Sequence, residues 1–267
     1  MPVKGPAPEE VLRRSIYNWS QTDWPSYCKL FEGAGGKAAV GEASVRYLYF
    51  EEAPARIRAT LPDVRLVAIL RDPVHRLYSH YVMNRQLSRR VSLEPLSLPD
   101  AIAAEPGRIA DGWGWDWHYV AVSRYAEQLR RYFEVFPRKQ ILVLLYDDIV
   151  QDPLGAFRRI CRHIGVDEAF VPDMSTRAMV GKRARNEQLG HWLWRRNKLG
   201  ALGRYVRPVT TPIVRRLKSW NEAPVPKLDR TLGEALIPRF REDLGELAEM
   251  LGRDIPWYRS EGGRWVM

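Results

Sequence analysis

Two short apolar runs place the strongest constraint on the fold of this chain. Residues 65–70 read RLVAIL, and residues 140–146 read QILVLLY. Both runs have the length of a strand, and neither alternates apolar with polar residues as a sheet with one solvated face requires. Apolar strands that are separated by helices are typical of a parallel sheet flanked by helices. The sequence therefore predicts the α/β class.

The segments around these runs predict the other elements. Residues 37–44, KAAVGEAS, are expected to form a short strand that ends near Ser44. Pro137 should stop one helix, and Asp152 with Pro153 should start another. Helices are expected over 26–34, 51–62, 73 to about 88, from about 95, over 122–136, over 153–165 and over 231–252.

A single domain is expected over residues 1–267, with a core of about 26–170 and a basic helical tail of about 175–267. Between His191 and Trp220 the tail carries eight Lys or Arg residues and no acidic residue. This segment also contains Trp, Leu and Val. It could lie on an anionic membrane, bind a polyanionic glycan, or form a solvated pair of helices.

The overall charge and the two cysteines limit the class of protein. A net charge of +10 favours a polyanionic partner, such as a sulfated or phosphorylated glycan, an anionic membrane or a multiply charged nucleotide. Cys28 and Cys161 are too few for a disulfide framework, and Cys161 lies on an apolar helical face where a buried thiol is expected. No apolar run approaches the roughly 20 residues that span a bilayer, and no signal peptide is evident. A cytoplasmic setting is expected.

The stretch LRDPVHRLYSHY, residues 70–81, joins the first apolar run to a helix. Asp72 is a suitable N-cap and Pro73 a suitable first helical residue, so the start of the helix is fixed. Ligands of parallel α/β sheets bind beyond the carboxyl ends of the strands. Arg71 at the strand exit and Ser79 on the helix could therefore converge on one anion, with Arg76 on the face that carries Ser79.

The same residues have an ordinary structural explanation. Arg71 could pair with a nearby carboxylate, and the Ser79 hydroxyl could satisfy the backbone of its own helix. Spacing alone favours neither interpretation.

A family resemblance adds to this reading. Residues 70–81, together with GEAS at 41–44 and the stretch 123–153, resemble the bacterial sulfotransferase domain that is akin to the heparan sulfate sulfotransferases. The resemblance extends from about Pro2 to Trp257 and implies a P-loop-like sulfotransferase fold. It implies the co-substrate 3′-phosphoadenosine 5′-phosphosulfate, whose 3′-phosphate would be gripped by the residues that match Arg71 and Ser79.

The resemblance includes a basic loop, whereas one element of the family is missing. Lys182 and Arg183 look similar to the basic loop that closes over the nucleotide in this family. The strand, loop and helix that hold the 5′-phosphosulfate in the family have no counterpart here. MPVKGPAPEE at the start resembles the next segment of the family, with Gly5 in place of its general base. Residues upstream of Met1 could supply the element, or a diverged chain could have kept the fold and lost the chemistry. The first is preferred, because losing a strand leaves a sheet edge unpaired.

Three further features are candidates for the acceptor side of the site. Glu42 ends the expected strand 37–44 and is the catalytic candidate, although it could equally be a cap or an ion-pair partner. Ala43 follows it, where glycan-modifying relatives carry a lysine. Tyr125 could border the acceptor or pack in the core. Residues 111–119, DGWGWDWHY, could stack on a sugar or lipid or fill a gap between helices.

Transfer of a sulfuryl group to a hydroxyl or amine of a glycan, lipid or small molecule is the leading hypothesis. The alternative is a non-catalytic protein that binds adenosine bisphosphate or polyanions. No metal is expected, because the five histidines show no ligand spacing, and no nucleic-acid partner is expected, because no recognisable module occurs. Residues 191–220 are the candidate for peripheral membrane contact, and the oligomeric state is open.

Overall fold

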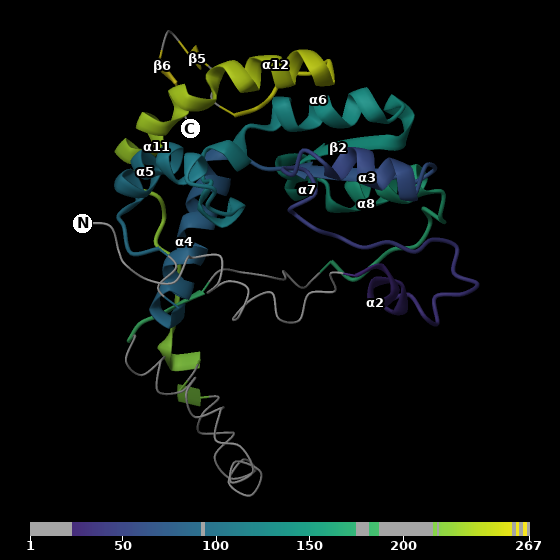
Figure 1. The fold of residues 1–267 in the computed structure, drawn as a ribbon, viewed down its shortest axis with the longest axis horizontal. Helices are drawn as coiled ribbons and strands as arrows, with labels where there is room; N and C mark the ends of the chain where they lie inside the picture. Colours follow the sequence, from purple (N-terminus) through teal and green to yellow (C-terminus); the bar gives the residue numbers. More distant parts are fainter. Residues whose placement is uncertain are drawn as a thin grey trace, which may run out of the picture.

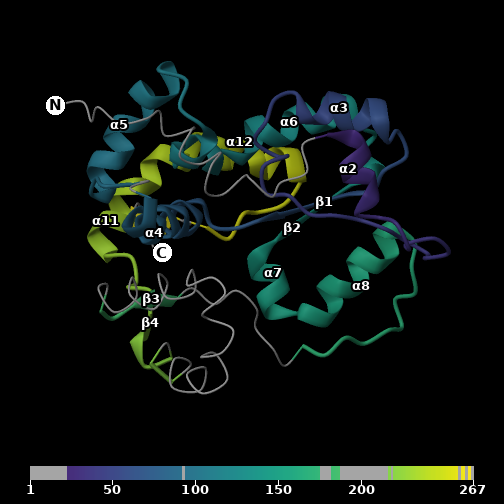
Figure 2. The same ribbon diagram turned by 60° about the horizontal axis from the view of Figure 1, so that its bottom comes forward.

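The structure is a computed structural model that describes residues 23–91, 94–174, 182–186, 216–217, 219–257, 260–261 and 264–265. A two-stranded parallel sheet lies at its centre, with helices on both sides (Figures 1 and 2). The predicted α/β class is confirmed. Most of the basic segment 191–220 lies outside the described residues.

The central sheet is formed by the two apolar runs. Strand β1, Leu66–Leu70, pairs in parallel with β2, Ile141–Leu145, and the register aligns Leu66 with Ile141 and Leu70 with Leu145. The strand expected over 37–44 is not formed, and these residues are exposed. Glycine and alanine have little preference for strands, and none of the described strands pairs with this stretch to compensate.

The helices and short elements follow the chain around this sheet. The described part of the chain up to Val135 contains α2 (Trp24–Lys29), α3 (Ala53–Thr60), α4 (Pro73–Val91), α5 (Leu98–Ala110) and α6 (Tyr125–Val135). The second half contains α7 (Tyr146–Gln151), α8 (Pro153–Ile164), α11 (Arg230–Leu236) and α12 (Arg241–Leu251). Short strands are β3 (Lys182–Ala184), β4 (Glu222–Pro224), β5 (Ser260–Glu261) and β6 (Arg264–Trp265), and 3-10 turns are η1 (Trp115–Trp117), η2 (Ala121–Ser123), η3 (Arg138–Gln140) and η4 (Ile237–Phe240).

Local signals explain where several helices begin and end. The Asp152 side chain accepts a hydrogen bond from the Gly155 N–H, and Gly165 ends α8 with a left-handed φ of 78°. The predicted start and end of this helix are therefore confirmed. The single helix expected over 231–252 is wrong, because it divides into α11, η4 and α12. Pro238 lies at the division, and its missing N–H interrupts an α-helical ladder.

The two faces of the sheet are covered to different extents. One face, which includes Leu70 and Leu145, packs into the main core with α6 and α12. On the other face, Leu144 is fully buried, but Ile69 beside it is 52% exposed. Figure 2 shows α7 and α8 below the sheet, and α8 packs on β2. The expectation that helices cover the strands on both faces therefore holds for β2 and only in part for β1.

The Trp-rich segment 111–119 packs mainly as part of the interior. Trp117 and Tyr119 are fully buried, while Trp113 and Trp115 are half-buried. The Glu105 carboxylate, which comes from α5, accepts hydrogen bonds from the backbone N–H groups of Tyr119, Val120 and Ala121. The segment is therefore held to α5 and fills a gap between helices, as one of the two predicted interpretations has it.

Acidification is expected to destabilise the fold through His80. The imidazole is 7% exposed and stacks on Trp115, with ring centroids 5.4 Å apart. Burial, and then the nearby positive Arg76, lower its pKa to about 3. Because the folded pKa lies below the unfolded value of about 6.5, the unfolded state binds more protons as the pH falls. The contribution of His80 to the free energy of unfolding should be fully present above about pH 6.5 and should fall by about 1.4 kcal/mol per pH unit below it.

Urea denaturation at neutral and mildly acidic pH measures this loss. His80→Phe keeps the ring stack and removes the titrating group, so the variant should lose less stability on acidification than the parent chain. Because the other titrating groups are present in both proteins, the difference between them reports the loss of the His80 charge together with its interaction with His118. Identical pH dependence in the two proteins would contradict the prediction.

Candidate functional site

The exit of β1 and the start of α4 are fixed by the Asp72 side chain. Its Oδ1 accepts a hydrogen bond from the His75 N–H at 2.8 Å, and its carbonyl accepts from the Arg76 N–H at 2.8 Å. Pro73 is the first residue of α4. The predicted helix start is therefore confirmed, and it places Arg71 where the strand opens to solvent.

Arg71 is an exposed arginine that two tyrosines contact, one through its side chain and one through its backbone. Its guanidinium lies over the ring of Tyr146 at the end of β2, 5.6 Å from the ring centroid. The Tyr125 hydroxyl donates a hydrogen bond to the Arg71 carbonyl at 2.8 Å. Burial raises the pKa of Tyr125 to about 12, so this hydroxyl stays protonated. Tyr125 thus packs in the core and also fixes the strand exit.

The acidic side chains near Arg71 are engaged elsewhere. On α7, Asp147 accepts a hydrogen bond from the Trp257 indole N–H at 2.8 Å. Asp148 pairs with Arg253 through two contacts of 2.7 and 3.0 Å, and this hydrogen bonding lowers the pKa of Asp148. Among the described residues, no ion pair joins Arg71 to a carboxylate. The guanidinium is therefore available to an external anion.

Ser79 and Arg76 take different directions from α4. Ser79 is exposed, and helical spacing puts it on the same side of the helix as His75. Arg76 instead faces the interior, where its guanidinium donates to the Ser123 hydroxyl at 2.6 Å and to the Tyr119 carbonyl at 2.7 Å. The expectation that Arg76 shares a face with Ser79 is wrong, because the buried Tyr119 carbonyl and Ser123 hydroxyl provide acceptors for it.

His75 adds a titratable group to the exposed face of α4. Its Nδ1 lies 3.3 Å from Asp72 Oδ1. The hydrogen bond with Asp72 raises the pKa of the imidazole, while burial and the positive charge of Arg71 oppose the shift. Arg71 just before α4, and His75 and Ser79 on the helix, are all exposed, and each side chain can donate a hydrogen bond to an oxyanion.

The other predicted site residues lie in different surroundings from those expected. Glu42 is exposed and does not end a strand; its carboxylate interacts with the hydroxyl of Tyr47, whose pKa burial and Glu42 both raise. Lys182 and Arg183 lie on β3, which pairs antiparallel with β4, so they are not part of a loop. Their side chains lie outside what the structure describes. Neither Glu42 nor β3 is joined to Arg71 by a contact in the described residues.

Metal-binding clusters and membrane-spanning helices are both absent from the described residues. In the described part of the chain, no three His, Cys, Asp or Glu side chains gather in a way that could hold a metal ion. Over the same residues, no helix is both long enough and apolar enough to span a bilayer.

The geometry at the end of β1 is typical of one class of site. Strand β1 of a parallel sheet leads through the exposed Arg71 into a capped helix that presents an imidazole and a hydroxyl to solvent. Sites of this kind, at the carboxyl end of a strand and the N-terminus of a helix, are suited to phosphate or sulfate groups. The chain therefore has the parallel α/β architecture in which such sites occur.

Comparisons with known proteins show which family part of this chain resembles. Residues 43–170 match the family model described as "Sulfotransferase family". Heparan sulfate glucosamine 3-O-sulfotransferase 3B1 of Mus musculus is 33% identical over 128 residues, and these cover 47% of this chain and 30% of the relative. The human 3B1 protein is 27% identical over 187 residues, which cover 67% of this chain and 44% of the relative. The chain therefore spans less than half the length of these relatives.

A solved structure supports the same conclusion. The sulfotransferase from Alicyclobacillus acidocaldarius is 28% identical, with a TM-score of 0.67, and the match covers 96% of this chain and 80% of that one. Residues 43–170 thus match the sulfotransferase family, and the resemblance to bacterial and heparan sulfate sulfotransferases is confirmed. This segment contains Arg71 and Ser79.

Proposed function

We propose that the protein transfers a sulfuryl group from 3′-phosphoadenosine 5′-phosphosulfate to a hydroxyl or amine. The observation that carries the proposal is Arg71, an exposed guanidinium without a carboxylate partner among the described residues, at a strand exit in a sulfotransferase-family segment. Arg71 and Ser79 bind the 3′-phosphate of the donor in this proposal. A guanidinium matches two phosphate oxygens with two parallel hydrogen bonds, which makes the contact strong and directional.

The proposed reaction is a direct displacement at sulfur. The acceptor oxygen or nitrogen forms a bond to sulfur, the bond between sulfur and the bridging phosphate oxygen breaks, and adenosine 3′,5′-bisphosphate leaves. The acceptor loses one proton, which a base removes. Glu42 is the carboxylate assigned to this proton, because it is exposed and thus accessible to an acceptor. Holding the donor by its 3′-phosphate orients the sulfur, which is a positioning contribution to the rate.

The acceptor proposed is a carbohydrate. Relatives of this chain are named as heparan sulfate glucosamine 3-O-sulfotransferases, and another is a bifunctional heparan sulfate N-deacetylase/N-sulfotransferase. The net charge of +10 supports an anionic glycan, because such a charge attracts a polyanion over the whole surface. Lipid and small-molecule acceptors lack this support from the comparisons.

A transfer assay tests the proposal. The chain is incubated with donor labelled in its sulfuryl group and with a heparan-type oligosaccharide, and the label on the glycan is measured. We expect transfer, and we expect Glu42→Gln to reduce turnover by about 100-fold, the size of a general-base contribution, without changing nucleotide binding. A chain that binds adenosine 3′,5′-bisphosphate but transfers no label to any acceptor would contradict catalysis and support the non-catalytic alternative.

A further inference from the structure

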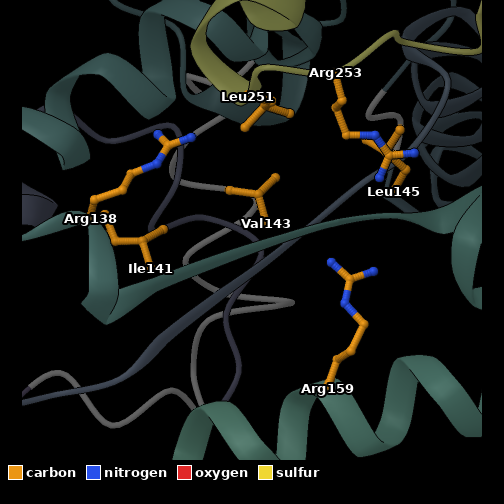
Figure 3. Close-up of a pocket in the computed structure, with 7 residues that line it drawn as sticks. All are labelled: Arg138, Ile141, Val143, Leu145, Arg159, Leu251 and Arg253. Atoms are coloured by element: carbon orange, nitrogen blue, oxygen red, sulfur yellow. The ribbon is translucent and has the colours of Figure 1, made fainter.

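A second basic feature lies along β2, outside the site at the end of β1. A cavity of about 150 Å³ is lined by Ile141, Val143 and Leu145 of the strand and by Leu251 and three arginines, Arg138, Arg159 and Arg253 (Figure 3). Arg253 follows α12 on one face of the sheet, and Arg159 comes from α8 on the other. Among the described strands, β2 has β1 as its single partner. The cavity therefore opens at the edge of β2 that faces away from β1.

Two of the three arginines are held in place. The Arg253 guanidinium makes two contacts with the Asp148 carboxylate, at 2.7 and 3.0 Å. Arg138 donates to the Met250 carbonyl at 2.6 Å and lies over the Phe133 ring, 3.8 Å from its centroid. A guanidinium that is already fixed loses little side-chain entropy when it binds a ligand. Both arginines therefore form a preorganised wall.

Arg159 is the arginine that is free to bind. Its side chain is exposed, and in the described part of the chain it makes no hydrogen bond or ion pair; its charge interaction is with Asp148. In Figure 3 its guanidinium points from α8 toward the strand. The lining residues include three arginines and no carboxylate, and Asp148 pairs with one of the three, so the charge that faces the cavity is positive. That charge matches a doubly charged or multiply charged oxyanion.

We propose that this arginine-lined cavity binds a sulfate or phosphate group, as a second anion site that uses neither Arg71 nor Ser79. Sulfate and phosphate oxygens accept the parallel hydrogen bonds that guanidinium groups offer. The group can be a sulfate ester on a glycan chain or a free inorganic anion. The site does not require the transfer reaction, so it stands independently of the proposed function.

A second explanation of the arginines is that they only prevent the open edge of β2 from pairing with other chains. Charged side chains beside an open strand edge prevent pairing with other chains. In that case they would repel strands without recognising any particular anion. The two explanations differ in one measurable respect, because protection predicts only diffuse attraction of anions, spread over the basic surface.

Isothermal titration with a heparin-derived hexasaccharide distinguishes these explanations. Titrations use the full chain at constant ionic strength, as parent, Arg159→Gln, and Arg158→Gln as the matched control. Arg158 is its exposed neighbour on α8 and does not line the cavity. Loss of a charge-assisted contact should weaken binding by about tenfold in Arg159→Gln, whereas Arg158→Gln should change it by roughly twofold or less. Circular dichroism confirms that both variants are folded.

The outcomes test whether the cavity binds an anion and which kind of molecule carries that anion. Equal weakening by the two variants, or no saturable binding, would overturn the proposal. Inorganic sulfate that competes with the hexasaccharide at equal ionic strength supports an anion site, and tighter binding of the hexasaccharide identifies the glycan as its source. A DNA duplex of equal charge that binds more tightly, and loses affinity in Arg159→Gln, would overturn the glycan source. Arg71→Ala should leave hexasaccharide binding to this cavity unchanged. A loss of nucleotide binding in that variant therefore reports on the donor site and not on this cavity.

Discussion

Replacing Arg71 with alanine is expected to weaken the binding of adenosine 3′,5′-bisphosphate by about tenfold or more. The bidentate contact of a guanidinium with a phosphate contributes about 1.5–3 kcal/mol, and each 1.4 kcal/mol is about a tenfold change in affinity. The substitution should leave the fold intact, because the Arg71 side chain is exposed and the contact with Tyr125 uses the backbone carbonyl. Calorimetric titration of the nucleotide into parent and variant measures the change.

The matched control for this experiment lies at the other end of the same strand. Arg65 is exposed, and its guanidinium donates to the Lys139 carbonyl at 3.3 Å. Arg65→Ala removes the same charge, but from the amino end of β1, so it should change the affinity by roughly twofold or less. If Arg71→Ala and Arg65→Ala weaken binding equally, the nucleotide senses net charge alone. Undiminished binding by Arg71→Ala would place the nucleotide at another site.

Features with a local chemical cause could be predicted from the sequence. The two apolar runs became β1 and β2, and the Asp72 cap and Pro73 set the start of α4. Asp152 and Gly165 similarly bound α8. In each case the residues that determine the structure lie within a few positions of one another, so the pattern contains the whole interaction. The exposed positions of Arg71 and Ser79 follow from the same local rules.

Features that depend on distant partners could not be predicted. Arg76 faces inward because Tyr119 and Ser123 present acceptors from a segment more than forty positions away, at separations of 43 and 47 residues. The N-terminus of α6 is capped by Asp243 of α12, which accepts from the Tyr125 N–H at 2.8 Å. The expected strand over 37–44 failed for a related reason, since a strand needs a neighbour that the sequence does not identify.

A buried ion pair gives the largest stability effect expected for this protein. Glu94 is fully buried, and its carboxylate accepts hydrogen bonds from Arg108 at 2.7 and 3.2 Å and from the Tyr119 hydroxyl at 2.7 Å. Arg108→Leu would leave the carboxylate buried without its cation. Breaking one side of a buried pair costs about 3–5 kcal/mol, so the free energy of unfolding should fall by about that amount. Urea denaturation of parent and variant provides the measurement.

An exposed pair in the same chain is the matched control. Arg130 and Glu246 form an ion pair with side chains that are 50% and 45% exposed. Arg130→Leu should cost about 1 kcal/mol or less, because water already solvates both charges. The double variant Glu94→Leu with Arg108→Leu should recover much of the loss of Arg108→Leu, since no unpaired charge remains in the interior. Equal costs for Arg108→Leu and Arg130→Leu would show that the Glu94 carboxylate is solvated after all.

The same pair connects stability to the proposed donor site. The Tyr119 hydroxyl binds Glu94, and the Tyr119 carbonyl binds the Arg76 guanidinium of α4. A loss of Arg108 therefore loosens the interior support of the helix that presents Ser79. Because Arg71 is held separately by Tyr125, Arg108→Leu should reduce stability much more than nucleotide affinity at a temperature where the variant is folded. A proportional loss of stability and affinity would mean that the phosphate contacts of Arg71 and Ser79 depend on this buried network.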